Sequence, residues 1–422
     1  MDQYVTRCAV RLKGVLRESE INEIAAEATF FRRLRKLTPV RAIWTFVTAM
    51  ASGTTKSLMD VVRLFTDLSG ETMRYKPFHD RLNVPGFPEF LRRTVAHFMT
   101  GLSEPIRYSR SPYLKHFDDI VAQDGSSFAL NDALADDFPS RFTKVSPAGI
   151  EVHCTYSLYE GQPTAISVAA DKEAERDFLP EPEELAGKLI LGDRGYTCYE
   201  YPTRVKAAGG DFIGRMSHKS FNPTVIKCYR GPFKHGAVAG KKLRDLKLPK
   251  SNVDLLIEGK GQQLRLVIYY VRSKDVHVYL LTTLCHRTFP PSVVAALYRL
   301  RWQIELFFKE CKSYTGLKKF STKKSHIVEG LVWASMLAIL IRRFLLYSAF
   351  RNTGKHPAPF IAASLSWTFF RDLAKIGLNS IRRLARALKE ILHLLRTTAE
   401  RTNPARKNSF EIVDIEPAKG LA

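Results

Sequence analysis

Residues 298–312 read YRLRWQIELFFKECK, and this segment decides how the rest of the chain is interpreted. Four polar side chains in it, Tyr298, Arg301, Glu305 and Lys312, are separated by 3, 4 and 7 residues. At about 100° per residue they fall within roughly 60° of one another on an α-helix. Apolar residues fill the neighbouring arc, so the spacing predicts an amphipathic helix with a polar stripe beside its buried face. Such a stripe fits a site for a metal ion and a phosphate, although an ordinary helix with an Arg301–Glu305 ion pair is the alternative.

The charge balance of the chain indicates a polyanionic partner. The sequence has 422 residues, 45% hydrophobic and 25% charged, which is typical of a globular protein with a large core. Its net charge is +23, an excess that most often serves to bind nucleic acid through phosphate contacts. An anionic membrane or a general solubility bias is less favoured, because the basic residues are interleaved with helical core patterns.

Three further features narrow the class of protein. The six cysteines are scattered without a CxxC spacing, which argues against a zinc site or a disulfide framework and fits a reducing compartment. The first residues contain no apolar stretch, so no signal peptide is predicted. The most apolar run, 327–350, is interrupted by Glu329 and by Arg342 and Arg343, and it is predicted to be a buried helix. We therefore expect a cytoplasmic protein with no membrane partner.

The first part of the chain, to about residue 105, shows helical periodicity. The predicted helices are 21–28, 40–50, 57–68 and 87–99. A basic cluster, Arg32, Arg33, Arg35 and Lys36, lies just before Pro39. The region fits either a helix-turn-helix DNA reader or a solvated helical domain, and the charge of the chain favours DNA contact.

From about residue 115 the pattern changes to strands. A short apolar run, 120–124, ends in Asp124, and residues 151–158 and 165–170 form a predicted hairpin. The run 188–191 leads to Asp193. A basic stretch then contains the predicted strands 211–216, 263–271 and 276–284, and a basic amphipathic helix, 381–395, is predicted near the end of the chain.

Three carboxylates stand out by position. Asp124 and Asp193 each lie at or near the end of an apolar strand, and Glu305 lies on the polar stripe. Such groups repel one another unless cations intervene. Mg²⁺ takes oxygen ligands, and a pair of ions can activate a hydroxyl and stabilise a leaving oxygen. Taken singly, Asp124 is better explained as a turn residue before glycine, and Asp193 as an N-cap or turn residue.

Read together, the motifs Asp124-Gly-Ser, Asp193-Arg-Gly-Tyr and Tyr-x2-Arg-x3-Glu-x6-Lys occur in that order. The chain here resembles the bacterial insertion-sequence transposases of the DDE class, in the family defined by the Tyr-Arg-Glu-Lys signature. The third motif matches at all four positions, and the similarity extends from about residue 29 to residue 347.

The resemblance implies an α/β fold, with an RNase H-like mixed sheet flanked by helices and interrupted by a β-rich insertion. The expected regions are a helical N-terminal DNA-binding region (1–110), the first part of the core (111–205), the β-strand insertion domain (206–288), the second part of the core (289–350) and a basic helical C-terminal region (351–422). Asp124 is expected on the first strand, Asp193 after the fourth and Glu305 on a following helix.

The resemblance also implies roles for the site residues. Asp124, Asp193 and Glu305 would be catalytic and would hold two Mg²⁺ ions, for which Mn²⁺ substitutes. Tyr298, Arg301 and Lys312 would bind phosphates of the transposon end. Arginine can donate two parallel hydrogen bonds to a phosphate, and lysine supplies a compact positive charge. Both stabilise the phosphate oxygens on which negative charge develops during phosphoryl transfer.

The expected function is a metal-dependent DNA transposase that nicks element ends and joins their 3′-hydroxyls to target DNA. Its partners would be double-stranded DNA and a second copy of the chain in the synaptic complex. The first alternative is a catalytically inactive DNA-binding protein with the same fold, and the second is a paired-carboxylate hydrolase. The charge of +23 and the cations beside Glu305 favour a phosphate substrate over the hydrolase.

Overall fold

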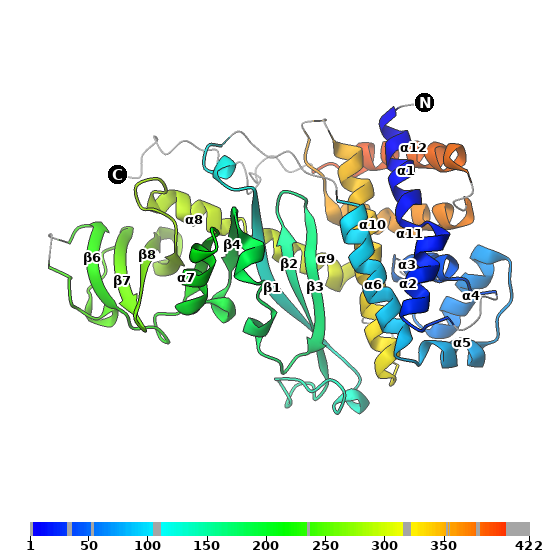
Figure 1. Cartoon of the computed structure of the whole chain (residues 1–422), viewed down its shortest axis with the longest axis horizontal. Helices are drawn as coiled ribbons and strands as arrows, with labels where there is room; N and C mark the ends of the chain where they lie inside the picture. Colours follow the sequence, from blue (N-terminus) through cyan, green and yellow to red (C-terminus); the bar gives the residue numbers. More distant parts are fainter. Residues whose placement is uncertain are drawn as a thin grey trace.

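A mixed β-sheet lies at the centre of the protein, with helices packed on it (Figure 1). The computed structural model describes residues 3–31, 36–51, 55–103, 111–233, 237–314, 322–351, 353, 355–376 and 380–401. Within these residues the sheet has nine strands in the order β3-β2-β1-β4-β5-β9-β8-β7-β6. They are β1 (Asp119–Ala129), β2 (Gly149–Ser157), β3 (Gln162–Ala170), β4 (Lys188–Gly192), β5 (Asp211–Met216), β6 (Thr224–Arg230), β7 (Val253–Gly259), β8 (Gln262–Val271) and β9 (Val276–Thr282).

The first five strands have the arrangement expected of an RNase H-like core. β1 pairs antiparallel with β2 and parallel with β4, β2 pairs antiparallel with β3, and β4 pairs parallel with β5. Among these five strands, β2 therefore runs against the other four. The predicted mixed sheet is confirmed, and the predicted hairpin is the β2–β3 pair, which turns at the left-handed Gly161.

The last four strands extend the same sheet. β9 pairs antiparallel with β5, and β8, β7 and β6 follow it, each antiparallel to its neighbour. Their buried side chains, among them Val225, Leu255 and Ile257, form a hydrophobic cluster separate from the main core. The β-rich segment thus has a small core of its own but shares its hydrogen bonding with the rest of the sheet.

Helices cover both faces of the sheet. The α-helices of the described residues are α1 (Gln3–Val15), α2 (Glu18–Glu27), α3 (Pro39–Ala51), α4 (Leu58–Ser69), α5 (Tyr75–Leu82), α6 (Gly86–Gly101), α7 (Glu200–Ala207), α8 (Pro291–Arg299), α9 (Trp302–Tyr314), α10 (Ser325–Phe350), α11 (Pro359–Ile376) and α12 (Ile381–Thr398). On one face, α7 packs through Tyr201 and Val205 on Ile190 of β4 and Phe212 of β5. On the other face, α8, α9 and α10 share the main core with the strands. The expected flanking of the sheet by helices is confirmed.

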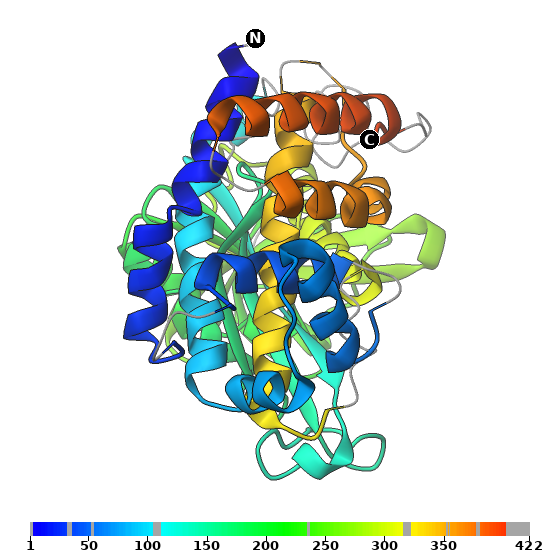
Figure 2. The same ribbon diagram turned by 90° about the vertical axis from the view of Figure 1, so that its right-hand side faces the viewer.

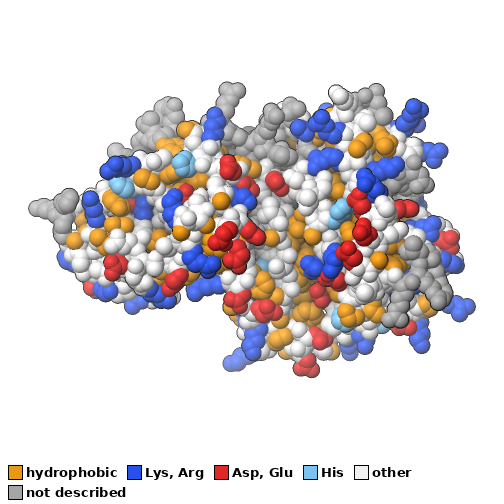
Figure 3. All heavy atoms as spheres, viewed as in Figure 1, with side chains coloured by type: hydrophobic (Ala, Val, Ile, Leu, Met, Phe, Trp, Pro, Cys, Tyr) orange, Lys and Arg blue, Asp and Glu red, His pale blue; other side chains and the backbone are white. Residues whose placement is uncertain are grey.

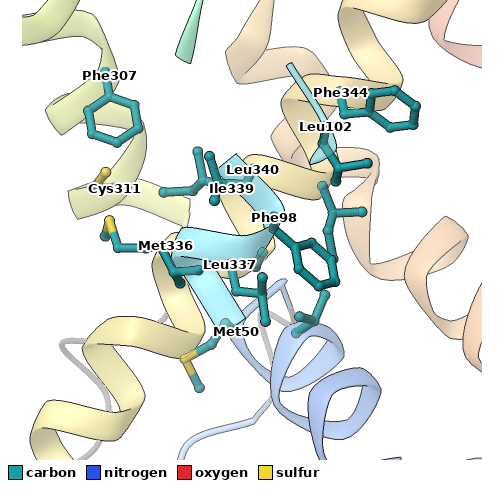
Figure 4. Packing of buried hydrophobic residues seen from close by; sticks show 14 of the residues in the cluster. Met50, Phe98, Leu102, Phe307, Cys311, Met336, Leu337, Ile339, Leu340 and Phe344 are labelled. Carbon is teal, nitrogen blue, oxygen red and sulfur yellow. The ribbon is translucent and has the colours of Figure 1, made fainter. Parts of the chain in front are cut away.

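The N-terminal and C-terminal helices form one layer around α10. Figure 2 shows α10 running vertically through the middle of this layer, with helices from both ends of the chain in front of it. Contacts join α10 to α3, α6 and α12, and α1 to α12. In Figure 4, Met50 of α3, Phe98 of α6 and Phe307 of α9 point toward side chains of α10. Segments at opposite ends of the sequence therefore share one hydrophobic core.

Helix α10 is long and apolar enough to cross a membrane by length and composition alone. However, 94% of its most apolar window is buried inside the protein, as predicted for a core helix. Two arginines interrupt it, and both pair with one carboxylate of α9. Arg342 Nη2 lies 2.5 Å from Glu310 Oε1, and Arg343 Nη2 lies 2.8 Å from Glu310 Oε2. This buried cluster ties α9 to α10.

The surface carries basic side chains at both ends of the face seen in Figure 3, over β6 and β7 and over α1 and α12. Of the basic cluster predicted before Pro39, residues 32–35 lie outside the described residues. Lys36 is described, and its Nζ lies 3.7 Å from Oε2 of Glu71. The predicted division into functional regions stays a prediction. Its boundary at 206 falls inside α7, because the helix that connects β4 to β5 belongs to the core.

Candidate active site

Two of the predicted site residues lie side by side at one edge of the sheet. In the parallel β1–β4 pair, Gln123 lies opposite Gly192, and the pairing ends there. The next residues are Asp124, which continues in β1, and Asp193, which leaves β4. Because side chains alternate along a strand, both aspartates point to the face on which Ala122 is buried.

The segment 298–312 is two helices, and the prediction of a single continuous helix was wrong. α8 ends at Arg299 and α9 begins at Trp302. Between them the amide of Arg301 donates to Tyr298 O and the amide of Ile304 donates to Arg301 O, at 3.1 Å each. These i→i+3 bonds tighten the chain into a turn. The turn changes the direction of the polar side chains, so that Arg301 reaches Asp124 of β1 while Glu305 lies in the first turn of α9.

The Arg301 guanidinium lies between two of the carboxylates. Its Nη1 donates to Asp124 Oδ2 at 3.1 Å, and its Nη2 donates to Glu305 Oε1. Burial lowers the pKa of Arg301, but Tyr298 and the carboxylates of Asp193, Asp124 and Glu305 raise it above its usual range. The side chain is only 12% exposed. Arg301 is thus a fixed cation that all three predicted catalytic carboxylates share.

The carboxyl of Asp124 is perturbed mainly by burial and to a smaller extent by its charged neighbours. Burial raises the pKa of its carboxyl to about 6, and the charges of Asp193 and Glu305 add to the increase. Arg301 and a 2.9 Å hydrogen bond from the Gly125 amide act in the opposite direction. One guanidinium therefore does not neutralise the site. An additional positive charge near Asp124 would favour the ionised form of this carboxyl.

Tyr298 and Lys312 flank the carboxylates. The Tyr298 hydroxyl donates to Asp193 Oδ1 at 3.4 Å, and burial raises the pKa of the phenol. Lys312 lies near the end of α9 and is exposed, with its Nζ 5.5 Å from the centroid of the Phe128 ring on β1. Tyr298 is therefore held at the carboxylates, whereas Lys312 lies over the part of β1 beyond Asp124.

The donor set fits a hard divalent cation in its chemistry. Asp124, Asp193 and Glu305 offer carboxylate oxygens, which Mg²⁺ and Mn²⁺ prefer. In the described part of the chain, however, no three His, Cys, Asp or Glu side chains are close enough to hold one ion together. At this site the guanidinium of Arg301 lies between Asp124 and Glu305 and donates to both. A divalent ion held by these carboxylates would take the electrostatic place of that guanidinium.

A second polar cluster supports the two aspartates from the opposite face of the sheet, and the sequence analysis missed it. A Cβ added to Gly125 would lie 2.5 Å from Glu151 Oε1, and one added to Gly195 would lie 1.6 Å from Glu175 Oε2. Both carboxylates pair with Arg141, whose Nη2 contacts Glu151 and whose Nη1 lies 2.9 Å from Glu175. The glycines that follow Asp124 and Asp193 are therefore places where this cluster packs against the backbone.

Comparison with known proteins agrees with this geometry. The sequence profile described as "Transposase DDE domain" matches residues 115–341, more than half of the chain. The chain belongs to this family. It is accordingly a DNA transposase, an enzyme that cuts DNA and transfers strands. The matched segment begins just before β1 and ends within α10, so it contains all three carboxylates and both helices α8 and α9.

Individual relatives are insertion-sequence transposases. The transposase for insertion sequence element IS1151 of Clostridium perfringens is 20% identical over 373 residues, covering 78% of this chain and 78% of that protein. The transposase for IS231B of Bacillus thuringiensis subsp. berliner is 23% identical over 371 residues, covering 77% of each. A solved piggyBac transposase synaptic complex with hairpin DNA aligns with a TM-score of 0.46 at 12% identity, covering 92% of this chain and 85% of that one.

Proposed function

We propose that this transposase cleaves the ends of an insertion sequence and joins the resulting 3′-hydroxyls to target DNA by two-metal-ion phosphoryl transfer. The observation that carries the proposal is the convergence of Asp124 and Glu305, from a strand and a helix far apart in the chain, on the single guanidinium of Arg301. An enzyme of this family uses divalent metal, and the hard oxygen donors favour Mg²⁺.

In the proposed mechanism Asp124, Asp193 and Glu305 hold the metal ions. When bound, the ions supply a polarised water or 3′-hydroxyl on one side of the scissile phosphate and charge stabilisation on the other. Arg301, released from the carboxylates, donates bidentate hydrogen bonds to the nonbridging oxygens of a phosphate. Tyr298 stays hydrogen-bonded at Asp193 and orients that carboxylate, while exposed Lys312 binds a phosphate beyond the site.

The remaining regions are proposed to bind and arrange DNA. The net charge of +23 supports contact with double-stranded DNA, both element ends and target, over a large surface. The helical regions 1–110 and 351–422 and the β-rich insertion 206–288 are the proposed DNA-binding and assembly parts. Since two ends are cut and joined together, we propose a homodimer in the synaptic complex, acting in the bacterial cytoplasm on the nucleoid.

The test uses a DNA duplex that carries the sequence bordering the coding region. Wild-type protein is expected to nick it with Mg²⁺ or Mn²⁺ and not with EDTA. The variants Asp124→Asn, Asp193→Asn and Glu305→Gln should bind the duplex but not cut it. Binding without cleavage by the wild type would support an inactive DNA-binding protein instead. Wild-type turnover in one variant would remove that carboxylate from the proposed metal ligands.

A further inference from the structure

A third strand continues the row of residues that carries the two aspartates. In the parallel β4–β5 pair Gly192 lies opposite Gly214, just as Gln123 lies opposite Gly192 in the β1–β4 pair. The residues that follow these three are Asp124, Asp193 and Arg215. They stand in register at the same edge of three adjacent strands, which are about 4.8 Å apart.

The side chain of Arg215 also lies on the same face as the aspartates. Two residues earlier in β5, Ile213 is buried in the main hydrophobic core, as Leu191 is in β4. By the alternation of side chains, Arg215 and Asp193 therefore point toward α8 and α9. The electrostatics agree with this placement. Burial raises the pKa of Tyr298, and the guanidiniums of Arg301 and Arg215 both act against that increase.

Arg215 differs from the other arginines of the sheet in what surrounds it. It is half-buried, and among the described residues no carboxylate or carbonyl is found paired with its guanidinium. By contrast, Arg265 of β8 forms two 2.8 Å bonds with Asp254, and Arg301 pairs with Asp124. A cation that is partly withdrawn from water without a partner costs free energy. That cost is offset when an anion binds.

We propose that Arg215 binds a backbone phosphate of the DNA strand, adjacent to the scissile phosphate on the β5 side of the site. The inference rests on the proposed function, because the scissile phosphate is placed at Asp124 and Asp193. The DNA strand then crosses the edge of the sheet from β1 over β4 to β5. Arg215 is a substrate-binding residue that donates bidentate hydrogen bonds to the phosphate.

The proposal is tested by binding of the same end duplex in the presence of EDTA, which separates it from cleavage. Arg215→Ala is expected to weaken binding about tenfold and to reduce the slope of log Kd against log salt by about 1. Arg215→Lys should keep most of the slope, since it keeps the charge. The matched control is Arg204→Ala on α7, an exposed arginine on the other side of the sheet, which should behave as wild type.

A methylphosphonate scan of the duplex locates the contact. In wild-type protein, neutralising one phosphate next to the cleavage position should weaken binding, and Arg215→Ala should be insensitive to that same change. The scan of the wild type does not depend on how well Arg215→Ala folds, so it can overturn the inference by itself, and the Arg215→Lys and Arg215→Ala scans assign the contact to Arg215. The inference is overturned if no phosphate next to the cleavage position weakens wild-type binding, or if Arg215→Ala keeps the wild-type salt slope. If instead the contact is found but the wild type never cuts, the proposed function fails and Arg215 remains a DNA-binding residue.

Discussion

The Nη1 atom of Arg301 lies 3.1 Å from Oδ2 of Asp124, although the two residues are 177 positions apart in the sequence. The same guanidinium contacts Glu305 four residues later. This one side chain therefore connects strand β1 to helix α9 at the site. The carboxylate of Asp193 also acts electrostatically on this guanidinium, which therefore offsets part of the negative charge of all three acidic residues.

The first prediction concerns this internal cation. Arg301→Met should lower the free energy of unfolding in EDTA by about 3 kcal/mol, because Asp124 and Glu305 lose their buried partner. Saturating Mn²⁺ should then raise the melting temperature of the variant more than that of the wild type, because only the variant binds the ion without displacing a guanidinium. Cleavage should be lost in both metals.

Thermal unfolding of the two proteins with EDTA and with Mn²⁺ measures this effect. Adding Asp124→Asn to the Arg301→Met variant is the control, since it removes one of the oxygens that the ion requires. An equal Mn²⁺ shift in wild type and Arg301→Met would show that Arg301 and the ion do not compete for the carboxylates.

The second prediction concerns pH and a carboxyl outside the active site. Burial raises the pKa of Asp119 from 3.8 to about 6, although the amides of Ile120 and Tyr159 donate to it. Between these two values the folded chain holds a proton that the unfolded chain has lost. Stability therefore falls as the pH rises from about 4 to 6, by up to about 1.4 kcal/mol per pH unit for this one group.

Melting temperatures across this pH range should decline less steeply in Asp119→Asn than in the wild type. The asparagine keeps an oxygen that accepts from both amides but carries no charge. Parallel curves for the two proteins would mean that Asp119 titrates at its ordinary value. At neutral pH the variant should be the more stable protein, because its buried group is never ionised.

The sequence predicted which residues lie together at this site better than it predicted the shape of the segment that carries them. Asp124 and Asp193 were recognisable because each follows an apolar run, and strand alternation together with parallel pairing then places them side by side. Arg301 and Glu305 were recognisable from their spacing. The turn between α8 and α9 was not predicted, because no proline or glycine lies between Tyr298 and Lys312 to indicate a break in the helix. It is fixed by contacts across the fold, such as Arg301 with Asp124.

The features that the sequence did not predict have a weak periodic pattern or depend on contacts between distant segments. β6 and β7 were not predicted individually. β6 carries Lys227 and Arg230 among its apolar residues, and its pairing with β7 contains bulges. The joint packing of N-terminal and C-terminal helices around α10 depends on contacts between distant segments, which periodicity does not encode. The cluster of Arg141, Glu151 and Glu175 was missed for the same reason, since its members come from three separate segments.

The third prediction concerns the ion cluster that holds α9 on α10. Glu310→Gln should lower the free energy of unfolding by about 3–5 kcal/mol, because it leaves Arg342 and Arg343 buried beside a neutral group. A surface carboxylate with two cationic partners is the control: Asp67 pairs with Arg371 and Lys375 but is 44% exposed. Asp67→Asn should cost about 1 kcal/mol or less. Equal losses in chemical unfolding would mean that water reaches Glu310.

The last prediction concerns the packing behind the catalytic strand. Gly125 does not have a positive φ, so alanine fits its backbone, but the new Cβ would meet Glu151 Oε1 at 2.5 Å and His153 Nδ1 at 3.1 Å. Glu151 is held by Arg141 and is itself buried, so β1 must yield.

Gly125→Ala should therefore cost about 1–3 kcal/mol of stability through overpacking. It should also reduce cleavage about 100-fold while end binding is retained, since a displacement near 1 Å at Asp124 would misplace a proposed metal ligand. Gly14→Ala is the matched control, because its Cβ meets nothing within 4 Å in α1 and alanine favours the helix. Melting curves and single-turnover cleavage of both variants make the comparison. If Gly125→Ala cuts DNA as fast as Gly14→Ala, the cluster of Arg141 and Glu151 does not position Asp124.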